Sequence, residues 1–295
     1  MNGKEKGFLL LTSHLGNPAR KPLTQAQLKT LAMRVQGREV PDEERELEER
    51  DLTALGYGRE MAQRILALLE EKALLEYYLT AGGDCIPITR CSSLYPVLMR
   101  ARMGQYCPGC LWARGDVSLL EKPAISLVGS RELKRENRVF AQAVGHMAAE
   151  NGLVLISGNA RGADRTAQEA CLASGGQVIS IVADELMAHP RRDGVLYLSE
   201  DGYAEAFSAQ RALSRNRYIH ALGQIAFVAQ ASLHKGGTWD GTTKNLRYGW
   251  STVVCFRDGS EASLELEQLG AYLAGIEELK DFADLPLGQP TLFDL

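Results

Sequence analysis

Two apolar segments that each end in a turn of small and basic residues constrain the fold of this chain more than any other feature. The first, AISLVGSR, covers residues 124–131, and the second, LVLISGNARGAD, covers residues 153–164. Each passes into a helical pattern, as a strand does when it feeds a loop and a helix in a parallel βα unit. Glycine lets the backbone approach an anion closely, and helix N–H groups and arginine can then bind it. The two loops therefore predict an anion site at the carboxyl edge of a parallel sheet.

Strand and helix patterns alternate from residue 124 onward. The expected strands are 124–128, 153–157, 177–183, 195–199, 225–229 and 252–256, the last of which ends the core. The expected helices are about 134–151, about 164–174 and one that begins near Gly241. The strands are continuous apolar runs, as burial on both faces of a parallel sheet requires. With right-handed crossovers, they predict a doubly wound, mainly parallel α/β sheet of the Rossmann-like type.

The 295 residues exceed the usual size of one domain, so we expect a large unit and a small one. Residues 1–80 predict a small helical domain, with a capping box at Thr24 and Gln27 and a second helix across 59–79. This domain is either a packing module or a small DNA-binding domain. We expect a connector at 81–123, the Rossmann-like domain at 124–279 and a flexible C-terminal tail at 280–295.

Composition and charge indicate the cellular compartment and the partners that we expect for the protein. No apolar run reaches the ~18 residues that a membrane span needs, and FLLL at 8–11 is too short for a signal peptide. We therefore predict a cytoplasmic protein with no membrane partner and with its six cysteines reduced. The net charge of −4 means that any binding of nucleic acid depends on a local basic site.

Cys107 and Cys110 have the spacing of zinc ligands or of a redox pair. A zinc ribbon needs a second pair, which Cys85 and Cys91 match poorly, and a redox pair should open a helix, whereas residues 112–116 continue as a loop. Incidental thiols are thus the main interpretation, with zinc and redox roles as alternatives. No metal site and no cofactor are predicted.

Four segments should converge at the carboxyl ends of the strands. They are 129–131, 157–164, 215–217 and 235–242. The dinucleotide fingerprint GxGxxG is absent after the first strand, and GxxxxGK[ST] is absent everywhere, which disfavours an NAD enzyme and a P-loop NTPase. The five histidines form no Ser-His-Asp set, so no catalytic residue is predicted.

These segments resemble those of the DprA/Smf family of bacterial DNA-processing proteins, whose Rossmann-like fold is shared with the lonely-guy nucleotide hydrolases. The matching residues are VGSR at 128–131, ISGNARGADRTAQEACLASGG at 156–176, SE at 199–200, RNRYI at 215–219 and GGTWDGT at 236–242. The similarity spans roughly residues 85–258, and residues 1–80 stand where the family often carries a sterile-alpha-motif-like domain. The chain departs from the family pattern in the loop ADELMAHPRRDG, residues 183–194.

The resemblance implies a protein without catalytic activity that binds single-stranded DNA and loads a RecA-type recombinase in recombination or natural transformation. The DNA- and phosphate-binding residues that we predict are Gly129, Ser130, Arg131, Ser157, Gly158, Arg161, Gly162, Asp164, Arg215, Asn216, Arg217, Lys235, Gly236, Gly237, Thr238 and Thr242. A carboxylate cannot hold a phosphate, so we expect Asp164 to cap its helix or to orient an arginine, with a catalytic acid as the third alternative. Trp239 lies in a glycine-rich turn where we expect no core position, so we predict that it stacks on a base. Oligomeric state stays open, with a homodimer as one arrangement.

The alternative on the same fold is a nucleotide sensor or a nucleoside-monophosphate phosphoribohydrolase. The related hydrolases carry a glutamate after a Pro-Gly-Gly-x-Gly-Thr turn, and here Lys244 and Asn245 stand in its place. Glu200 is the other candidate carboxylate, and for it a structural role is the main interpretation.

A motif at the C-terminus suggests one more partner. Gln289, Leu292 and Phe293 resemble the Gln-x-x-Leu-Phe motif with which bacterial replication and repair proteins dock on the sliding clamp. Leu292 and Phe293 would enter an apolar cleft, with Gln289 hydrogen-bonded at its rim. The alternative is that the tail folds back and completes the core.

Overall fold

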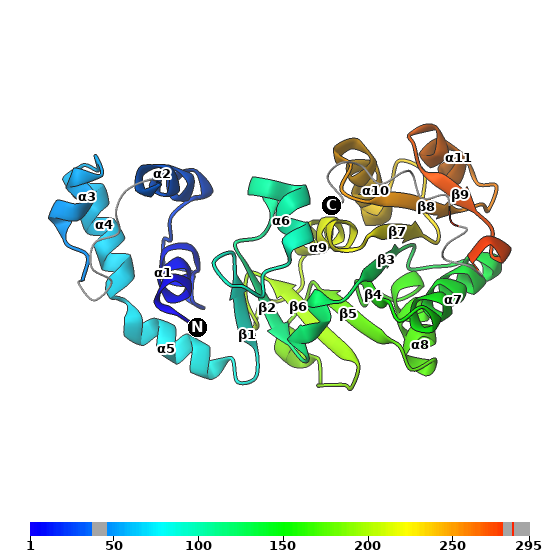
Figure 1. Cartoon of the computed structure of the whole chain (residues 1–295), viewed down its shortest axis with the longest axis horizontal. Helices are drawn as coiled ribbons and strands as arrows, with labels where there is room; N and C mark the ends of the chain where they lie inside the picture. Colours follow the sequence, from blue (N-terminus) through cyan, green and yellow to red (C-terminus); the bar gives the residue numbers. More distant parts are fainter. Residues whose placement is uncertain (37–45, 280–284, 286–295) are drawn as a thin grey trace.

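The computed structural model describes residues 1–36, 46–279 and 285. Within these residues, nine strands form one sheet in the order β1-β2-β6-β5-β4-β3-β7-β8-β9 (Figure 1). The strands are β1 (Ile86–Thr89), β2 (Cys110–Arg114), β3 (Ala124–Val128), β4 (Val154–Ser157), β5 (Gln177–Val182), β6 (Val195–Glu200), β7 (Ile225–Val228), β8 (Thr252–Phe256) and β9 (Tyr272–Ala274). From β6 across to β9, neighbouring strands are parallel, whereas the β1–β2 and β2–β6 pairs are antiparallel. The predicted doubly wound, mainly parallel α/β sheet is confirmed.

Helices cover both faces of the parallel part of the sheet (Figure 1). One face carries α7 (Arg135–Glu150) and α8 (Ala163–Ala173), and the other carries α6 (Val97–Met103), α9 (Ala209–Leu222), α10 (Gly236–Tyr248) and α11 (Glu261–Gln268). Along β3, Leu127 is buried in the cluster that contains Phe140 of α7, and Val128 is buried in the cluster that contains Tyr218 of α9. Burial on both faces explains why every residue of β3 is apolar or small.

The order of the strands reverses between β3 and β7. From β3, the chain adds β4, β5 and β6 on one side, and α9 then crosses back so that β7 pairs with the free edge of β3, with Ser126 opposite Ala226. The loops that leave the carboxyl ends of β3 and β7 therefore diverge. In open α/β sheets, this divergence opens a crevice in which ligands bind.

Among the described residues, five helices precede the sheet and lie to one side of it (Figure 1). They are α1 (Gly3–Thr12), α2 (Gln25–Val35), α3 (Glu49–Ala54), α4 (Arg59–Glu70) and α5 (Lys72–Ala81). The capping box predicted at Thr24 and Gln27 is present at the start of α2. The single helix expected across 59–79 is wrong, because Glu71 (ψ 36°) breaks it into α4 and α5. Tyr78 of α5 stacks on Tyr203 and meets Trp112 of β2 edge-on, with ring centroids 4.6 and 5.4 Å apart.

Residues 81–123 contribute more than a connection. They include β1, β2 and α6 and two short 3₁₀ turns, Gly104–Tyr106 and Val117–Glu121. The expectation that residues 112–116 continue as a loop is wrong, because β2 pairs with β6 and places Leu111 opposite Glu200. Two further 3₁₀ turns lie at Leu186–Ala188 and Glu277–Leu279.

The end of the chain also differs from the expectation. Strand β8 does not end the core, since α11 and the short edge strand β9 follow it. The predicted tail at 280–295 lies outside the described residues except for Leu285, and so do Gln289, Leu292 and Phe293. In the described part of the chain, no helix is long and apolar enough to cross a membrane.

Candidate functional site

A cavity of about 590 Å³ opens at the crevice between the carboxyl ends of β3 and β7. The loops after β3 and β7 and the N-terminal parts of α9 and α10 line it. The lining residues are Val128, Gly129, Ser130, Arg131, Ala160, Asp164, Phe207, Ala209, Ala212, Leu213, Arg215, Asn216, Gln230, Ser232, Lys235, Gly236, Gly237 and Thr238. We call it the large cavity.

A second cavity of about 230 Å³, the small cavity, adjoins the large one. Arg131, Ala160, Phe207 and Arg215 line both. The small cavity is completed by Gly158, Asn159, Arg161, Arg165, Ala183 and Asp184. All four predicted segments thus contribute to one continuous site, although four of the predicted residues line neither cavity: Ser157, Gly162, Arg217 and Thr242.

A buried ion pair holds the centre of the site. Arg215 Nη1 lies 3.3 Å from Asp164 Oδ2, and the two side chains are 8% and 7% exposed. The N–H of Ala160 donates to the same carboxylate oxygen at 3.2 Å. Burial raises the pKa of Asp164, and the positive charge of Arg215 opposes that shift. Asp164 therefore orients an arginine, which is one of the roles predicted for it.

The ion pair depends on a glycine. A Cβ atom at Gly158 would lie 0.9 Å from Arg215 Nη1 and 2.7 Å from Asp164 Oδ2. The guanidinium therefore rests directly on the backbone of the loop after β4. Only glycine leaves this space free.

The loops after β3 and β4 also pack directly on each other. The N–H of Ala163 donates to the carbonyl of Ser130 at 3.1 Å. Gly162, with φ +89°, makes this possible, since a Cβ atom there would lie 2.4 Å from the Ser130 carbonyl oxygen. Gly162 thus supports the site without lining it.

Exposed cations and a helix N-terminus give the large cavity its charge. Arg131 and Lys235 are exposed at its edge and form no ion pair within the described part of the chain. Lys235 is also the N-cap of α10, so the first residues of that helix, Gly236 and Gly237, face the cavity. A helix N-terminus carries partial positive charge and unpaired N–H donors. The site is therefore suited to an anion, although the net charge of the chain is −4.

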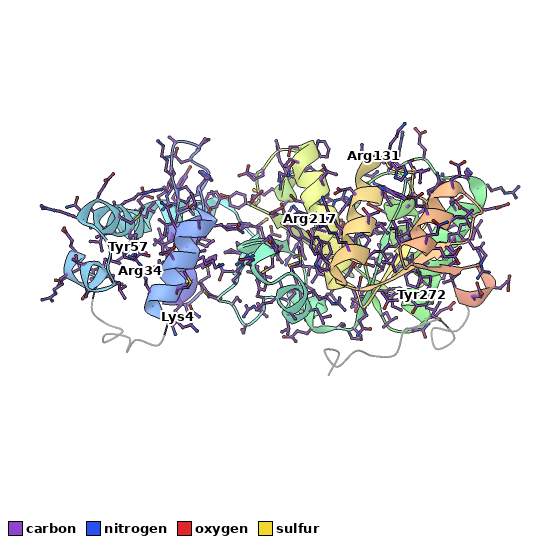
Figure 2. All side chains as sticks on the ribbon, turned by 90° about the horizontal axis from the view of Figure 1, so that it is seen from above. Lys4, Arg34, Tyr57, Arg131, Arg217 and Tyr272 are labelled. Atoms are coloured by element: carbon purple, nitrogen blue, oxygen red, sulfur yellow. The ribbon has the colours of Figure 1, made fainter. Side chains whose placement is uncertain are left out.

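Arg217 points elsewhere. Its guanidinium donates to Ser214 Oγ at 3.0 Å, and its charge acts on Glu200. The physical reason is the helix itself, because residues two apart on a helix differ by about 200° in direction. Arg215 faces the cavities, so Arg217 cannot, and Figure 2 shows Arg217 well apart from Arg131. Arg217 was predicted to bind DNA, but it is Arg131 and Lys235 that bring exposed positive charge to the large cavity.

Two small polar residues of the predicted set are also buried. Ser157 is fully buried in β4, and its hydroxyl accepts a hydrogen bond from Gln168 Nε2 at 2.7 Å. Thr242 is fully buried in α10. Both lie below the surface that a ligand would reach.

The prediction for Trp239 is wrong. The segment expected to be a glycine-rich turn is the first part of α10, which begins at Gly236 and not near Gly241. In the helix, Trp239 is 9% exposed, belongs to the core cluster on that face of the sheet, and meets His234 edge-on with ring centroids 5.0 Å apart. Its ring is therefore not available to stack on a base.

Sequence reasoning missed Phe207. This aromatic side chain is 57% exposed and lines both cavities, so it offers the exposed ring that was expected of Trp239. It lies in the irregular stretch between β6 and α9, where no periodicity or motif marks it. Gln230 and Ser232, after β7, and Asn159 and Arg165, after β4, were missed as well.

Glu200 does not belong to this site. It lines a different cavity of about 420 Å³, between the N-terminal helices and strands β2 and β6. Burial raises its pKa to about 7, and the hydroxyl of Tyr218 donates to its carboxylate. Asp164 is the acidic residue that lines the large cavity, and it is paired with Arg215.

Cys107, Cys110 and His220 line neither the large nor the small cavity. Cys107 Sγ donates to the carbonyl of Gly104 at 2.9 Å, and Cys110 begins strand β2. His220 is fully buried, and burial lowers its pKa to about 3, so its ring is neutral. Among the described residues, no group of three or more His, Cys, Asp or Glu side chains is placed to hold a metal ion.

Several known proteins are similar to this chain. DNA processing protein DprA of Streptococcus pneumoniae is 32% identical over 139 residues, which cover 44% of this chain and 49% of that protein. Protein Smf of Escherichia coli is 29% identical over 160 residues, which cover 49% of this chain and 41% of that protein. The chain thus spans about half the length of the curated relatives that it matches.

Two solved structures share the fold. The X-ray structure of DprA from Streptococcus pneumoniae superposes with a TM-score of 0.65 at 23% identity, over 85% of this chain and 90% of that one. DprA from Helicobacter pylori, solved in a study of its single-stranded DNA binding mode, gives 0.56 at 22% identity, over 68% and 94%. The family model described as DNA recombination-mediator protein A matches residues 87–263, and this range contains every residue that lines the two cavities. The chain belongs to the family of DNA recombination-mediator protein A.

Proposed function

We propose that this chain binds single-stranded DNA in the large cavity and acts as a mediator that delivers the strand to a RecA-type recombinase during recombination or natural transformation. Membership of the recombination-mediator family supports this role. The similar fold of a Helicobacter pylori protein studied for its binding of single-stranded DNA supports the ligand. The observation that carries the proposal is the arrangement of Arg131, Lys235 and the N-terminus of α10 around one cavity.

The arrangement suits a phosphate backbone. Arg131 and Lys235 supply charge without competing ion pairs in the described residues, and Gly236 and Gly237 bring backbone N–H groups to the same cavity. Phosphate contacts of this kind position a strand without reading its sequence. Phe207 offers an exposed ring on which a base can stack. The expected ligand is therefore a single strand held by its phosphates and one stacked base.

The first test is a salt titration of binding to a labelled 20-nucleotide dT strand, followed by fluorescence anisotropy. If ~3–4 phosphates are neutralised, the plot of log affinity against log salt should have a slope of about −2 to −3. Arg131→Ala and Lys235→Ala should each weaken binding and reduce the slope by about 0.7. An affinity that does not depend on salt would contradict the proposal.

Two control variants test whether binding depends on this cavity or on positive charge anywhere on the protein surface. Arg247 lies in the last turn of α10, at the opposite end of the helix from the cavity, so Arg247→Ala removes the same charge elsewhere. Arg217 was predicted from the sequence to bind DNA, but it lines neither cavity, so Arg217→Ala tests which of the two assignments is right. Both variants should bind the strand like the unmodified protein.

Two further measurements address the mediator role and the alternative ligand. The assembly of a RecA-type recombinase on DNA coated with single-strand-binding protein should be faster with this chain present, and Arg131→Ala should remove the effect. Nucleoside monophosphates should compete with the strand only weakly, since one phosphate replaces several contacts. Strong competition would favour a nucleotide sensor.

A further inference from the structure

The small cavity differs from the large one in its lining, which combines four arginines with one exposed carboxylate. Arg131, Arg161 and Arg165 supply the donors, and Asp184 is the acidic residue of its lining. The side chain of Asp184 is 51% exposed, so it is open to a ligand. A carboxylate repels phosphate, so the part of this cavity beside Asp184 suits a group that donates hydrogen bonds.

Asp184 is held in a fixed position. Its Oδ1 lies 2.9 Å from His189 Nε2, and Asn159 Nδ2 lies 3.4 Å from His189 Nδ1. One neutral tautomer satisfies both contacts, with Nε2–H donating to Asp184 and Nδ1 accepting from Asn159. The imidazole also stacks on Tyr197 of β6, with ring centroids 5.1 Å apart.

The loop that carries Asp184 and His189 is anchored to the sheet. Arg114 at the end of β2 donates to the carbonyls of Met187 and His189, at 2.8 and 2.6 Å. This loop is the segment 183–194 in which the sequence departs from the family pattern. These contacts of Arg114 and His189 hold the carboxylate of Asp184 at the edge of the small cavity.

We propose that the small cavity binds a guanine base of the strand whose phosphates occupy the large cavity. This inference rests on the proposed function. Guanine presents two neighbouring donors, N1–H and the N2 amino group, which can meet the two oxygens of Asp184. Its other edge presents two acceptors, O6 and N7, and an arginine binds that pair with two hydrogen bonds. Arg131, Arg161 and Arg165 are the exposed arginines of this cavity, and Arg161 also lies 3.2 Å from Glu132 Oε1 in an exposed ion pair.

The other bases do not match this pattern. Adenine and cytosine each place a ring-nitrogen acceptor beside their amino group, and that acceptor would face a carboxylate oxygen. Thymine offers a single N–H between two carbonyls. A fixed carboxylate therefore rejects these bases as well as attracting guanine. Phe207 lines both cavities and can stack on the base where the strand passes from one cavity to the other.

The test measures binding of 20-nucleotide dT strands that carry one central dG, dA or dC, by fluorescence anisotropy with the full chain. The dG strand should bind about tenfold more tightly than the others, the size expected for one good bidentate pair. Replacing dG by deoxyinosine, which lacks the N2 amino group, should remove most of that preference. Replacing it by 7-deaza-dG should reduce the preference through loss of the N7 acceptor.

The matched variants are Asp184→Asn and Asp193→Asn. Asp193 is exposed on the same loop and lines neither cavity, so its variant removes one charge without touching the site. In Asp184→Asn, the ratio of the dT and dG dissociation constants should fall from about ten toward one, whereas in Asp193→Asn it should not change. Melting curves of both variants show whether they are folded.

The outcomes separate the two proposals. If no strand binds, the proposed function fails. If all strands bind equally, or if Asp184→Asn keeps the preference for dG, single-strand binding stands and the guanine pocket is overturned. Competition by GMP and AMP against the dT strand is an independent test. If the cavity recognises guanine, whether in DNA or in a free nucleotide, GMP should compete better than AMP. Equal competition would count against the guanine pocket.

Discussion

Replacement of Gly158 by alanine is the most direct test of how the site is built. The new methyl group would lie 0.9 Å from Arg215 Nη1 and 2.2 Å from Cζ, so the guanidinium has to leave its place. Asp164 would then remain buried at 7% exposure without its charged partner. Breaking a buried ion pair by loss of one partner costs ~3–5 kcal/mol, and we expect Gly158→Ala to destabilise the fold by about that amount.

Thermal and urea denaturation followed by circular dichroism would measure this loss. For a unit of roughly 150–250 residues, each kcal/mol lowers the melting temperature by about 2–4 °C, so the expected shift is about 6–20 °C. Gly7→Ala is the matched control, because a Cβ atom at Gly7 in α1 meets nothing within 4 Å. That variant should be neutral or slightly more stable, since alanine favours a helix interior by ~1 kcal/mol over glycine.

A double-mutant cycle tests the mechanism itself. Arg215→Ala empties the space that the new methyl group needs, so Gly158→Ala should cost far less in that background than alone. The coupling between the two changes should be ~1–3 kcal/mol. The conclusion that Arg215 is fixed on the Gly158 backbone would be refuted if the two losses of stability were additive. It would also be refuted if Gly158→Ala melted at the same temperature as the unmodified protein.

Three further predictions concern other parts of the chain. Burial raises the pKa of Glu200 to about 7 from 4.5, so the stability that this residue contributes is fully present below pH 4.5 and is lost as the pH rises through 7. Glu200→Gln should therefore raise the melting temperature at pH 8 and leave it nearly unchanged at pH 5. Equal shifts at both pH values would contradict the raised pKa. Incubation with nucleoside monophosphates should release no free base above background, because Asp164 in the large cavity is paired with Arg215 and Glu200 lines another cavity; release that Glu200→Gln abolishes would favour the hydrolase. The QPTLF motif predicts association with the sliding clamp in the micromolar range, measured by surface plasmon resonance and lost in the Leu292→Ala/Phe293→Ala variant; earlier melting of that variant would show instead that the tail is part of the core.

The central sheet could be predicted from local patterns in the amino-acid sequence. Strands β3, β4, β5, β6, β7 and β8 were predicted within one residue at each end, because a buried strand of a parallel sheet is a short, mainly apolar run that can be recognised without knowing its neighbours. The glycine and arginine residues after β3 and β4 also identified the edge at which a ligand site forms, since the direction of parallel strands places those loops together. The fold class and the position of the site could therefore be predicted from short segments of the sequence.

Tertiary structure decided which side chains the site uses. Strand β2 was missed because its stability comes from pairing with β6, with Leu111 opposite Glu200, and no local pattern encodes a partner so distant in the chain. Arg215 and Arg217 look equivalent in the sequence, yet the phase of α9 aims one at the cavities and the other away. Trp239 is in the core because α10 begins earlier than its glycines suggested, whereas Phe207 reaches the site from an irregular stretch that carries no local pattern. The link from Arg114 through His189 to Asp184 joins three separate segments, so only the folded chain brings it together.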